Sequence, residues 1–181
     1  MILYMAIPTI HESPGNEKSD RGGYVLMQSR RTRNFSQNMS PVCALVVSSD
    51  EVVQRSLAGT IAQCGLLVFR AFTVGESRRI LNRWNICLVV CDDRLIDGNY
   101  EDLLKATETS RTKAPVIVLS LAGGWPEYFQ AVSAGVFDFL AYPPIPGELP
   151  RVVRHALESH VLRSFEEAET KHSEYSEGGA L

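Results

Sequence analysis

Short apolar runs rich in β-branched residues alternate with helix-forming segments from residue 44 onward, and this alternation constrains the fold more than any other feature. Such runs are typical of strands buried on both faces of a parallel sheet. Parallel strands need crossover connections, which place helices on both faces of the sheet. The sequence therefore predicts an α/β fold with a doubly wound, five-stranded parallel sheet. The expected strands are 44–47, 66–72, 86–91, 116–120 and 137–142.

Helices are expected after each of these strands. Ser49 or Asp50 is a suitable N-cap for the first one. Its buried face is predicted to carry Val52, Val53, Leu57, Ile61 and Ala62. The last expected helix runs from Gly147 to about Arg163, and its apolar stripe is predicted at Leu149, Val152, Val153, Ala156, Leu157 and Val161.

Length and composition indicate one folded domain with two tails. The chain has 181 residues, of which 45% are hydrophobic, enough for a packed core. Residues 1–40 lack a sustained hydrophobic period and are expected to be a disordered or loosely ordered arm. Residues 41–162 are expected to be the domain, and 163–181 an acidic helix extension or disordered tail. Met39 is a candidate for the biological start, which would place the arm outside the native protein.

Several classes of protein are disfavoured. No stretch approaches the ~20 consecutive apolar residues of a membrane helix, and the opening residues do not form a signal peptide. The net charge of −3 includes a negative balance over 41–162, whereas nucleic-acid binders concentrate positive charge on the folded part. The cysteines show no zinc spacing, so we expect buried thiols in a reducing, cytoplasmic compartment. They are Cys43, Cys64, Cys87 and Cys91.

Polar side chains gather where the predicted strands end. In doubly wound sheets, function collects outside the carboxyl ends of the strands, at the switch in strand order. No glycine-rich phosphate loop follows the first strand, which disfavours a nucleotide-binding fold. The groups delivered to this edge are Ser48, Ser49, Asp50, Asp92, Asp93, Ser120 and Tyr142.

The motifs LVVSSDE, CLVVCDDRLIDG, PVIVLSLA and GVFDFLAYPP, in this order, resemble the receiver domain of bacterial two-component response regulators, over about residues 42–160. The resemblance implies a flavodoxin-like (CheY-like) three-layer sandwich. It also implies Asp92 as the phosphoacceptor, Ser120 as the phosphate-contacting hydroxyl and Phe139 as a switch aromatic. The Tyr142–Pro143 bond matches a junction that is cis in the family, and only X–Pro bonds adopt cis cheaply.

Three positions depart from this family. Ser48 and Ser49 stand where the family carries the acidic pair that holds Mg²⁺, and Tyr142 stands in place of its lysine. Serine supplies no negative charge for the metal, and tyrosine supplies no cation for an acyl phosphate. No cofactor is therefore expected to be required, although a weak magnesium site at Asp50, Asp92 and Asp93 is conceivable.

Three functions follow, in order of preference. The first is a stand-alone pseudo-receiver of phosphorelay type that acts by binding another protein. The second is a functional receiver that a histidine kinase phosphorylates on Asp92, despite a weakened magnesium site. The third is a transcriptional regulator that uses the basic arm at Arg30–Arg33, since no helix-turn-helix unit fits after residue 162.

An independent enzyme is not expected, because no histidine is placed to serve a serine or cysteine nucleophile. The expected partner is a histidine kinase or a downstream effector. It would bind the face formed by the fourth helix, fifth strand and fifth helix, with homodimerisation through the same face as a further option. Trp125, Tyr128 and Phe129 lie near the edge of that face; exposed, they would mark an interface, and buried, they would belong to the core.

Overall fold

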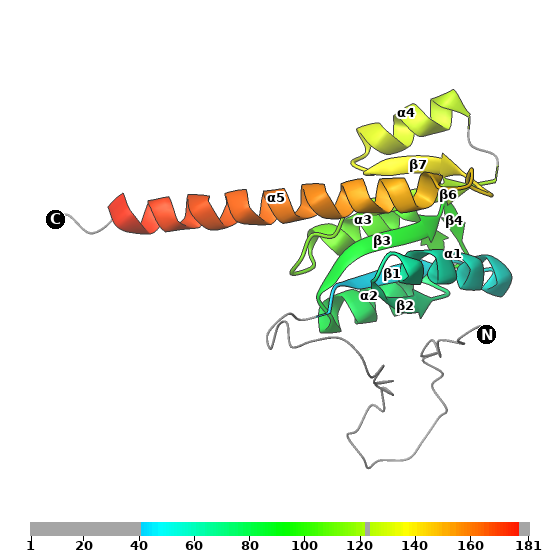
Figure 1. Ribbon diagram of the computed structural model, residues 1–181, viewed down its shortest axis with the longest axis horizontal. Coiled ribbons are helices and arrows are strands. Elements are labelled where there is room, and N and C mark those ends of the chain that lie inside the picture. The colour runs from blue at the N-terminus through cyan, green and yellow to red at the C-terminus, as the bar shows by residue number, and fades with distance from the viewer. Residues whose placement is uncertain (1–40, 122–123, 178–181) are drawn as a thin grey trace, which may run out of the picture.

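The computed structural model describes residues 41–121 and 124–177, and Figure 1 shows the arrangement of its elements. The Arg30–Arg33 cluster and Met39 lie outside the described residues. In the described part of the chain, no helix is long and apolar enough to cross a membrane.

Five parallel strands form the central sheet, as the alternating pattern predicted. Their order is β2-β1-β3-β6-β7, so the chain moves outward in both directions from the first strand. In register, Val47 lies opposite Cys91, Asp92 opposite Leu119 and Ser120 opposite Ala141. The strands are β1 (Cys43–Val47), β2 (Leu67–Ala71), β3 (Ile86–Asp92), β6 (Val116–Ser120) and β7 (Asp138–Ala141).

Helices cover both faces of this sheet and complete the predicted three-layer sandwich (Figure 1). On one face, α1 (Glu51–Gln63) and α5 (Glu148–Glu177) pack their buried side chains against the sheet. On the other face lie α2 (Val74–Arg83), α3 (Tyr100–Glu108) and α4 (Trp125–Ser133). The central strands β1 and β6 are buried along their whole length, which explains their continuous apolar sequence.

The first helix begins as predicted, and its predicted face is buried at Leu57 and Ile61, with Val53 and Ala62 partly buried against the core. The Asp50 side chain caps α1 by accepting from the backbone N–H groups of Val52 and Val53. Val52 is nonetheless exposed, so its predicted place on the buried face was wrong. Gln54 is buried; its side-chain NH2 donates to the Ala71 carbonyl at the end of β2 (2.8 Å), whereas its Oε1 has no hydrogen-bond partner among the described residues.

The last helix is longer than the predicted end at about Arg163. It continues to Glu177 and projects past the sheet (Figure 1). Burial along this helix reaches His160, whereas the predicted Val161 is exposed, as are Leu162 and Phe165.

Two smaller predictions were also incomplete. Between β3 and α3 the chain forms a short antiparallel hairpin, β4 (Arg94–Leu95) with β5 (Gly98–Asn99), which the predicted alternation of strands and helices does not include. The four thiols are free, but not all are buried: Cys64 is exposed because it follows the last residue of α1, and Cys87 is half-buried. Burial raises the pKa of the Cys91 thiol and that of Cys43.

Candidate functional site

The carboxyl ends of β1, β3 and β6 bring most of the predicted site residues to one edge of the sheet. The strand order reverses between β1 and β3, and Asp92 is the last residue of β3, next to this switch point. Ser48 directly follows β1, and Ser120 ends β6. Asp92 and Ser48 are in contact, as described next.

Asp92 is half-buried, and its surroundings disfavour its charged form. Burial is the largest influence and raises the pKa of the carboxyl, and the negative charges of Asp93 and Asp50 raise it further. Hydrogen bonds from the Ser48 side chain and the Ser49 backbone act in the opposite direction without cancelling the rise. Among the described residues, the two charges that influence Asp92 are both negative, so these residues offer its carboxylate hydrogen-bond donors and no compensating cation.

The two serines that stand in place of the acidic pair are engaged by the backbone around them. Ser48 is fully buried; its hydroxyl oxygen accepts from the Asp50 backbone N–H (3.2 Å) and lies 3.1 Å from the Asp50 carbonyl oxygen. The Ser49 hydroxyl donates to the Phe72 carbonyl (3.4 Å) and accepts from the Ile96 N–H (3.1 Å). Ser49 thus links the loop after β2 to the hairpin after β3.

Ser120 contacts the neighbour of the predicted phosphoacceptor. Its hydroxyl donates to Asp93 Oδ2 (2.8 Å), and the Asp93 N–H donates to the Leu119 carbonyl (3.0 Å), which fixes both ends of Asp93 against β6. At the end of β7, the half-buried Tyr142 donates its N–H to the Ser120 carbonyl (2.9 Å), and the Tyr142–Pro143 peptide bond is cis.

Asp97 is a site residue that the sequence analysis missed. Its carboxylate accepts from the N–H groups of Val74 (2.7 Å) and Gly75 (3.0 Å) at the start of α2. Burial acts to raise the pKa of Asp97. These two N–H donors and the Arg78 guanidinium outweigh that effect and hold the pKa below its ordinary value. Nothing in the local pattern signals this contact, because its partners lie more than twenty residues earlier in the chain.

The donor set at this edge does not fit Mg²⁺. The ion needs several oxygen ligands, preferably carboxylates, in near-octahedral geometry. The Asp50 carboxylate is used as the cap of α1, and the two serine hydroxyls are hydrogen-bonded as described. Within residues 41–121 and 124–177, no group of three or more acidic, histidine or cysteine side chains could hold a metal. The weak site considered at Asp50, Asp92 and Asp93 is therefore not supported by the arrangement of its oxygens.

The predicted switch aromatic and the predicted interface aromatics differ in exposure. Phe139 is buried in the core between the sheet and α2, α3 and α4. On α4, Trp125 and Phe129 are exposed, and Tyr128 is half-buried between them and the core. The three α4 rings form a cluster with centroids 5.8–6.0 Å apart.

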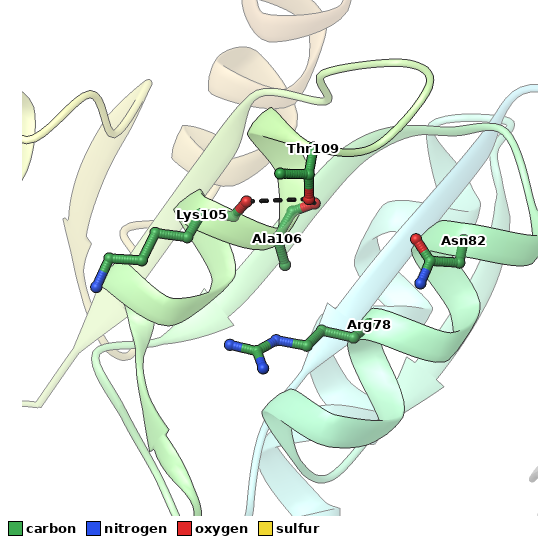
Figure 2. A pocket seen from close by; sticks show the side chains of 5 residues that line it. All are labelled: Arg78, Asn82, Lys105, Ala106 and Thr109. Carbon is green, nitrogen blue, oxygen red and sulfur yellow. Dashed lines mark hydrogen bonds between the residues drawn. The ribbon is translucent and has the colours of Figure 1, made fainter.

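Two cavities lie away from this edge. Figure 2 shows one of about 340 Å³ between α2 and α3, lined by Arg78, Asn82, Lys105, Ala106 and Thr109. Thr109 uses its hydroxyl within its own helix, as a donor to the Ala106 carbonyl (3.1 Å). The other, of about 410 Å³, lies between α1 and α5. Neither contains a residue of the strand ends, so we place the functional site at the edge and not in a cavity.

Curated proteins of similar sequence include a response regulator by name. The chain is 33% identical over 119 residues to the response regulator protein PilR of Pseudomonas aeruginosa, which covers 66% of this chain and 27% of that protein. It is 31% identical over 144 residues to the protein PetR of Rhodobacter capsulatus, which covers 78% of this chain and 57% of that one. The chain thus spans about a quarter to three fifths of the length of these relatives. No protein-family model matches the sequence.

Solved structures of similar fold are receiver domains and response regulators. A response regulator from Chloroflexus aurantiacus superposes with a TM-score of 0.60 at 25% identity, covering 66% of this chain and 99% of that one. A CheY-like receiver domain protein from Methanospirillum hungatei gives 0.61 at 22% identity, over 68% and 99%. The beryllofluoride-activated NtrC4 receiver domain, a dimer in solution, gives 0.60 at 22% identity, over 65% and 98%. The last two likenesses bear on the fold alone.

Proposed function

Because the chain carries a receiver domain of the CheY-like response-regulator family, we propose that it is a pseudo-receiver: a signalling module that binds a protein partner without ordinary phosphorylation of Asp92. One observation carries this proposal. The hydroxyls of Ser48 and Ser49 occupy the place of the acidic pair and hydrogen-bond to their surroundings, so the loops at the edge are joined without a metal.

The charge balance around Asp92 supports the same proposal. Phosphoryl transfer to a carboxylate depends on neutralising the negative charge that builds up on the transferred group. Here the neighbouring charges that act on Asp92 are the carboxylates of Asp93 and Asp50. Tyr142 stands where the family has its cation, and a phenol can donate one hydrogen bond but carries no positive charge at neutral pH. An acyl phosphate on Asp92 would therefore lack both stabilising partners.

The face formed by α4, β7 and α5 is the surface that we propose for partner binding. Trp125, Phe129 and Val132 follow one another at helical spacing on α4, and all three are exposed. Aromatic side chains in such positions are enriched at the centres of protein interfaces. The partner would be a histidine kinase or a downstream effector, in the cytoplasm, and a second copy of the chain could use the same surface.

The role as a stand-alone protein is part of the proposal. The chain matches only 27% of PilR, so the activity of that whole protein does not transfer to this one. A transcriptional role through direct DNA contact would depend on Arg30–Arg33, which lie outside the described residues. It therefore remains a third option with no contact in its support.

The alternative function keeps phosphorylation of Asp92 by a histidine kinase. It is favoured by the position of Asp92, half-buried at the end of β3 beside the switch in strand order, with Ser48 and the Ser49 backbone as hydrogen-bond donors. In this case a magnesium ion would have to displace hydrogen bonds that Ser48 and Ser49 now make.

A titration with Mg²⁺, with and without beryllofluoride, distinguishes the two functions. The full chain would be followed by amide NMR and tryptophan fluorescence, with Asp92→Asn as the matched control. The pseudo-receiver predicts no specific shift at Asp92, Ser120 or Phe139 in a well-folded sample. Saturable shifts at these residues that disappear in Asp92→Asn would discard the proposal in favour of the alternative.

A further inference from the structure

The pocket between α2 and α3 combines two cations with neutral hydrogen-bonding groups. Its volume of about 340 Å³ lies at the lower end of the range for small-molecule sites, roughly 300–1,000 Å³. Arg78 and Asn82 lie one turn apart on α2, and Lys105 lies one turn before Thr109, the residue that ends α3. Together with Ala106, these side chains form what we call the α2–α3 pocket (Figure 2).

The charged groups of this pocket lie at one end and the neutral groups at the other. Both helices lead back from the carboxyl edge of a parallel sheet, so they run in the same direction and residues one turn earlier on each share an end. Arg78 and Lys105 therefore lie nearer the carboxyl edge than Asn82 and Thr109. Figure 2 shows the same separation, with the guanidinium and ammonium groups extending away from the amide and the hydroxyl.

Neither cation is fully neutralised by the carboxylates around it. In the described part of the chain no ion pair includes Arg78; its charge acts on Asp97, but that carboxylate is already hydrogen-bonded at the start of α2. Lys105 lies 3.9 Å from the carboxylate of Asp102, which also closes the capping box at the start of α3. Exposed pairs at such distances contribute little, so both cations can bind an anion.

The neutral end of the pocket offers both donors and acceptors. The exposed Asn82 amide can do both, and the Thr109 hydroxyl donates to the Ala106 carbonyl (3.1 Å), which leaves its oxygen able to accept from a ligand. Between the two ends, the small side chain of Ala106 keeps the space between the helices open (Figure 2). The pocket therefore fits a ligand that is anionic at one end and hydroxylated at the other.

We propose that the α2–α3 pocket binds a phosphate monoester of a small hydroxylated molecule, such as a sugar or polyol phosphate. The fork of the Arg78 guanidinium can donate to two phosphate oxygens, and the Lys105 ammonium can donate to the third. The ligand hydroxyls would then bond to Asn82 and Thr109. A phosphate monoester carries up to two negative charges at neutral pH and three acceptor oxygens, so it matches two cations better than a single carboxylate does.

This site goes beyond the proposed function, because it is a small-molecule site on a different part of the molecule. The surface proposed for the protein partner consists of α4, β7 and α5, whereas this pocket lies on α2 and α3. The second cavity, between α1 and α5, offers a comparison: its lining includes one cation, Arg154, beside the apolar side chains of Pro150, Val153 and Leu157.

The test uses the terminal phosphate esters of glycerol and ribose as probes. The full chain would be titrated with each ester at about 0.15 M salt, where weak surface attraction is screened, and followed by amide NMR. Free glycerol, free ribose and inorganic phosphate are the comparison ligands. We expect saturable shifts over residues 78–82 and 105–109 with at least one ester, weaker binding of inorganic phosphate, and no shift with the uncharged compounds.

Single substitutions separate the two ends of the pocket. Arg78→Gln should weaken binding of the ester about tenfold, because a charge-assisted hydrogen bond is lost. Arg154→Gln, which removes one arginine from the other cavity, is the matched control and should leave binding unchanged. Asn82→Ala should weaken binding of the ester several-fold and leave that of inorganic phosphate unchanged, because only the ester reaches the neutral end.

Filling the pocket is a further test. Ala106→Leu should abolish binding, because the longer side chain would occupy the space between the helices. If this variant does not fold, Lys105→Gln serves in its place, since Lys105 is exposed and its loss should weaken binding several-fold. The absence of saturable shifts with both esters, binding unchanged in Arg78→Gln, or equal affinity for inorganic phosphate and the esters would each overturn the proposal. The beryllofluoride titration tests the proposed function independently of this result.

Discussion

Hydroxyl groups at two positions change what the edge of this sheet can bind. A carboxylate at position 48 or 49 would need a cation, whereas a serine satisfies its hydroxyl with the backbone around it. Ser49 does so by donating to the Phe72 carbonyl and accepting from the Ile96 N–H, and so joins the loop after β2 to the hairpin after β3. At the scale of single residues, a serine at this position forms a link between two loops that needs no ion.

Asp97 should contribute measurably to stability at neutral pH. Its carboxylate accepts from two N–H groups at the start of α2, and its pKa is lowered in the folded protein. A lowered pKa means that the stabilisation is present above the unfolded-state pKa and is lost as the pH falls through the folded-state value. Because Asp97 is exposed and solvent screens its charge, Asp97→Ala should cost less than about 1 kcal/mol at pH 7, and the cost should shrink in acid.

Urea denaturation of both proteins across this pH range measures the effect. Asp97→Asn is the matched control: it keeps an acceptor oxygen but not the charge, so it should lose less stability than the alanine variant. An Asp97→Ala chain as stable as the unmodified one at pH 7 would contradict the role assigned to these hydrogen bonds.

Asp92 should behave in the opposite way. Burial raises its pKa above the ordinary value of 3.8, so the ionised carboxylate destabilises the folded state at neutral pH. Asp92→Asn removes this cost and should raise Tm at pH 7. The gain should decrease as the pH falls through the folded-state pKa and be absent once the carboxyl is protonated in both states. Thermal unfolding at a series of pH values measures it; a lower Tm at pH 7 would refute the electrostatic account.

At the scale of elements, the positions of the strands were predictable and the orientations of the helices less so. Strands β1, β3 and β6 are continuously apolar, because both of their faces are covered, and their boundaries were predicted within one residue. The prediction for the first helix left Gln54 off the buried face, because pattern reasoning assigns a glutamine to solvent. In the structure this side chain is buried and donates to the Ala71 carbonyl. Local periodicity contains no information about such a distant partner.

The fifth helix allows a matched test of the observed boundary between packed and projecting parts. Val153 is buried against the sheet, and Val161, two turns later on the same helix, is half exposed. Val153→Ala should lower the free energy of unfolding by about 2 kcal/mol, from lost burial plus the cavity left behind. Val161→Ala should change it by less than about 0.5 kcal/mol. Equal losses in chemical denaturation would mean that the projecting part is packed.

At the scale of the whole molecule, the fold could be predicted from the sequence more completely than the contacts within the site. The sandwich follows from the alternation of apolar runs with helix-forming segments, and both the structure and the similar proteins confirm it. The location of the site follows from topology alone. Its contacts do not: the hydrogen bond from Ser120 to Asp93 and the link through Ser49 depend on loop geometry.

Our central proposal also concerns the whole molecule: the chain keeps the receiver fold without the phosphorylation chemistry of the family. Restoring the three altered positions together, as Ser48→Asp, Ser49→Asp and Tyr142→Lys, would return both the metal-binding carboxylates and the cation to the edge of an unchanged sheet. Since Asp92 and Ser120 are already at the strand ends, this triple variant should gain the phosphorylation chemistry that we propose the unmodified chain to lack.

Intact mass spectrometry after incubation with acetyl phosphate and Mg²⁺ tests this claim most directly. The account predicts that the full-length chain keeps its mass, and that the triple variant gains one phosphoryl group, which is lost again when Asp92→Asn is added. A phosphoryl group on the unmodified chain that depends on both Mg²⁺ and Asp92 would contradict the account and identify the protein as a working phosphorylation switch.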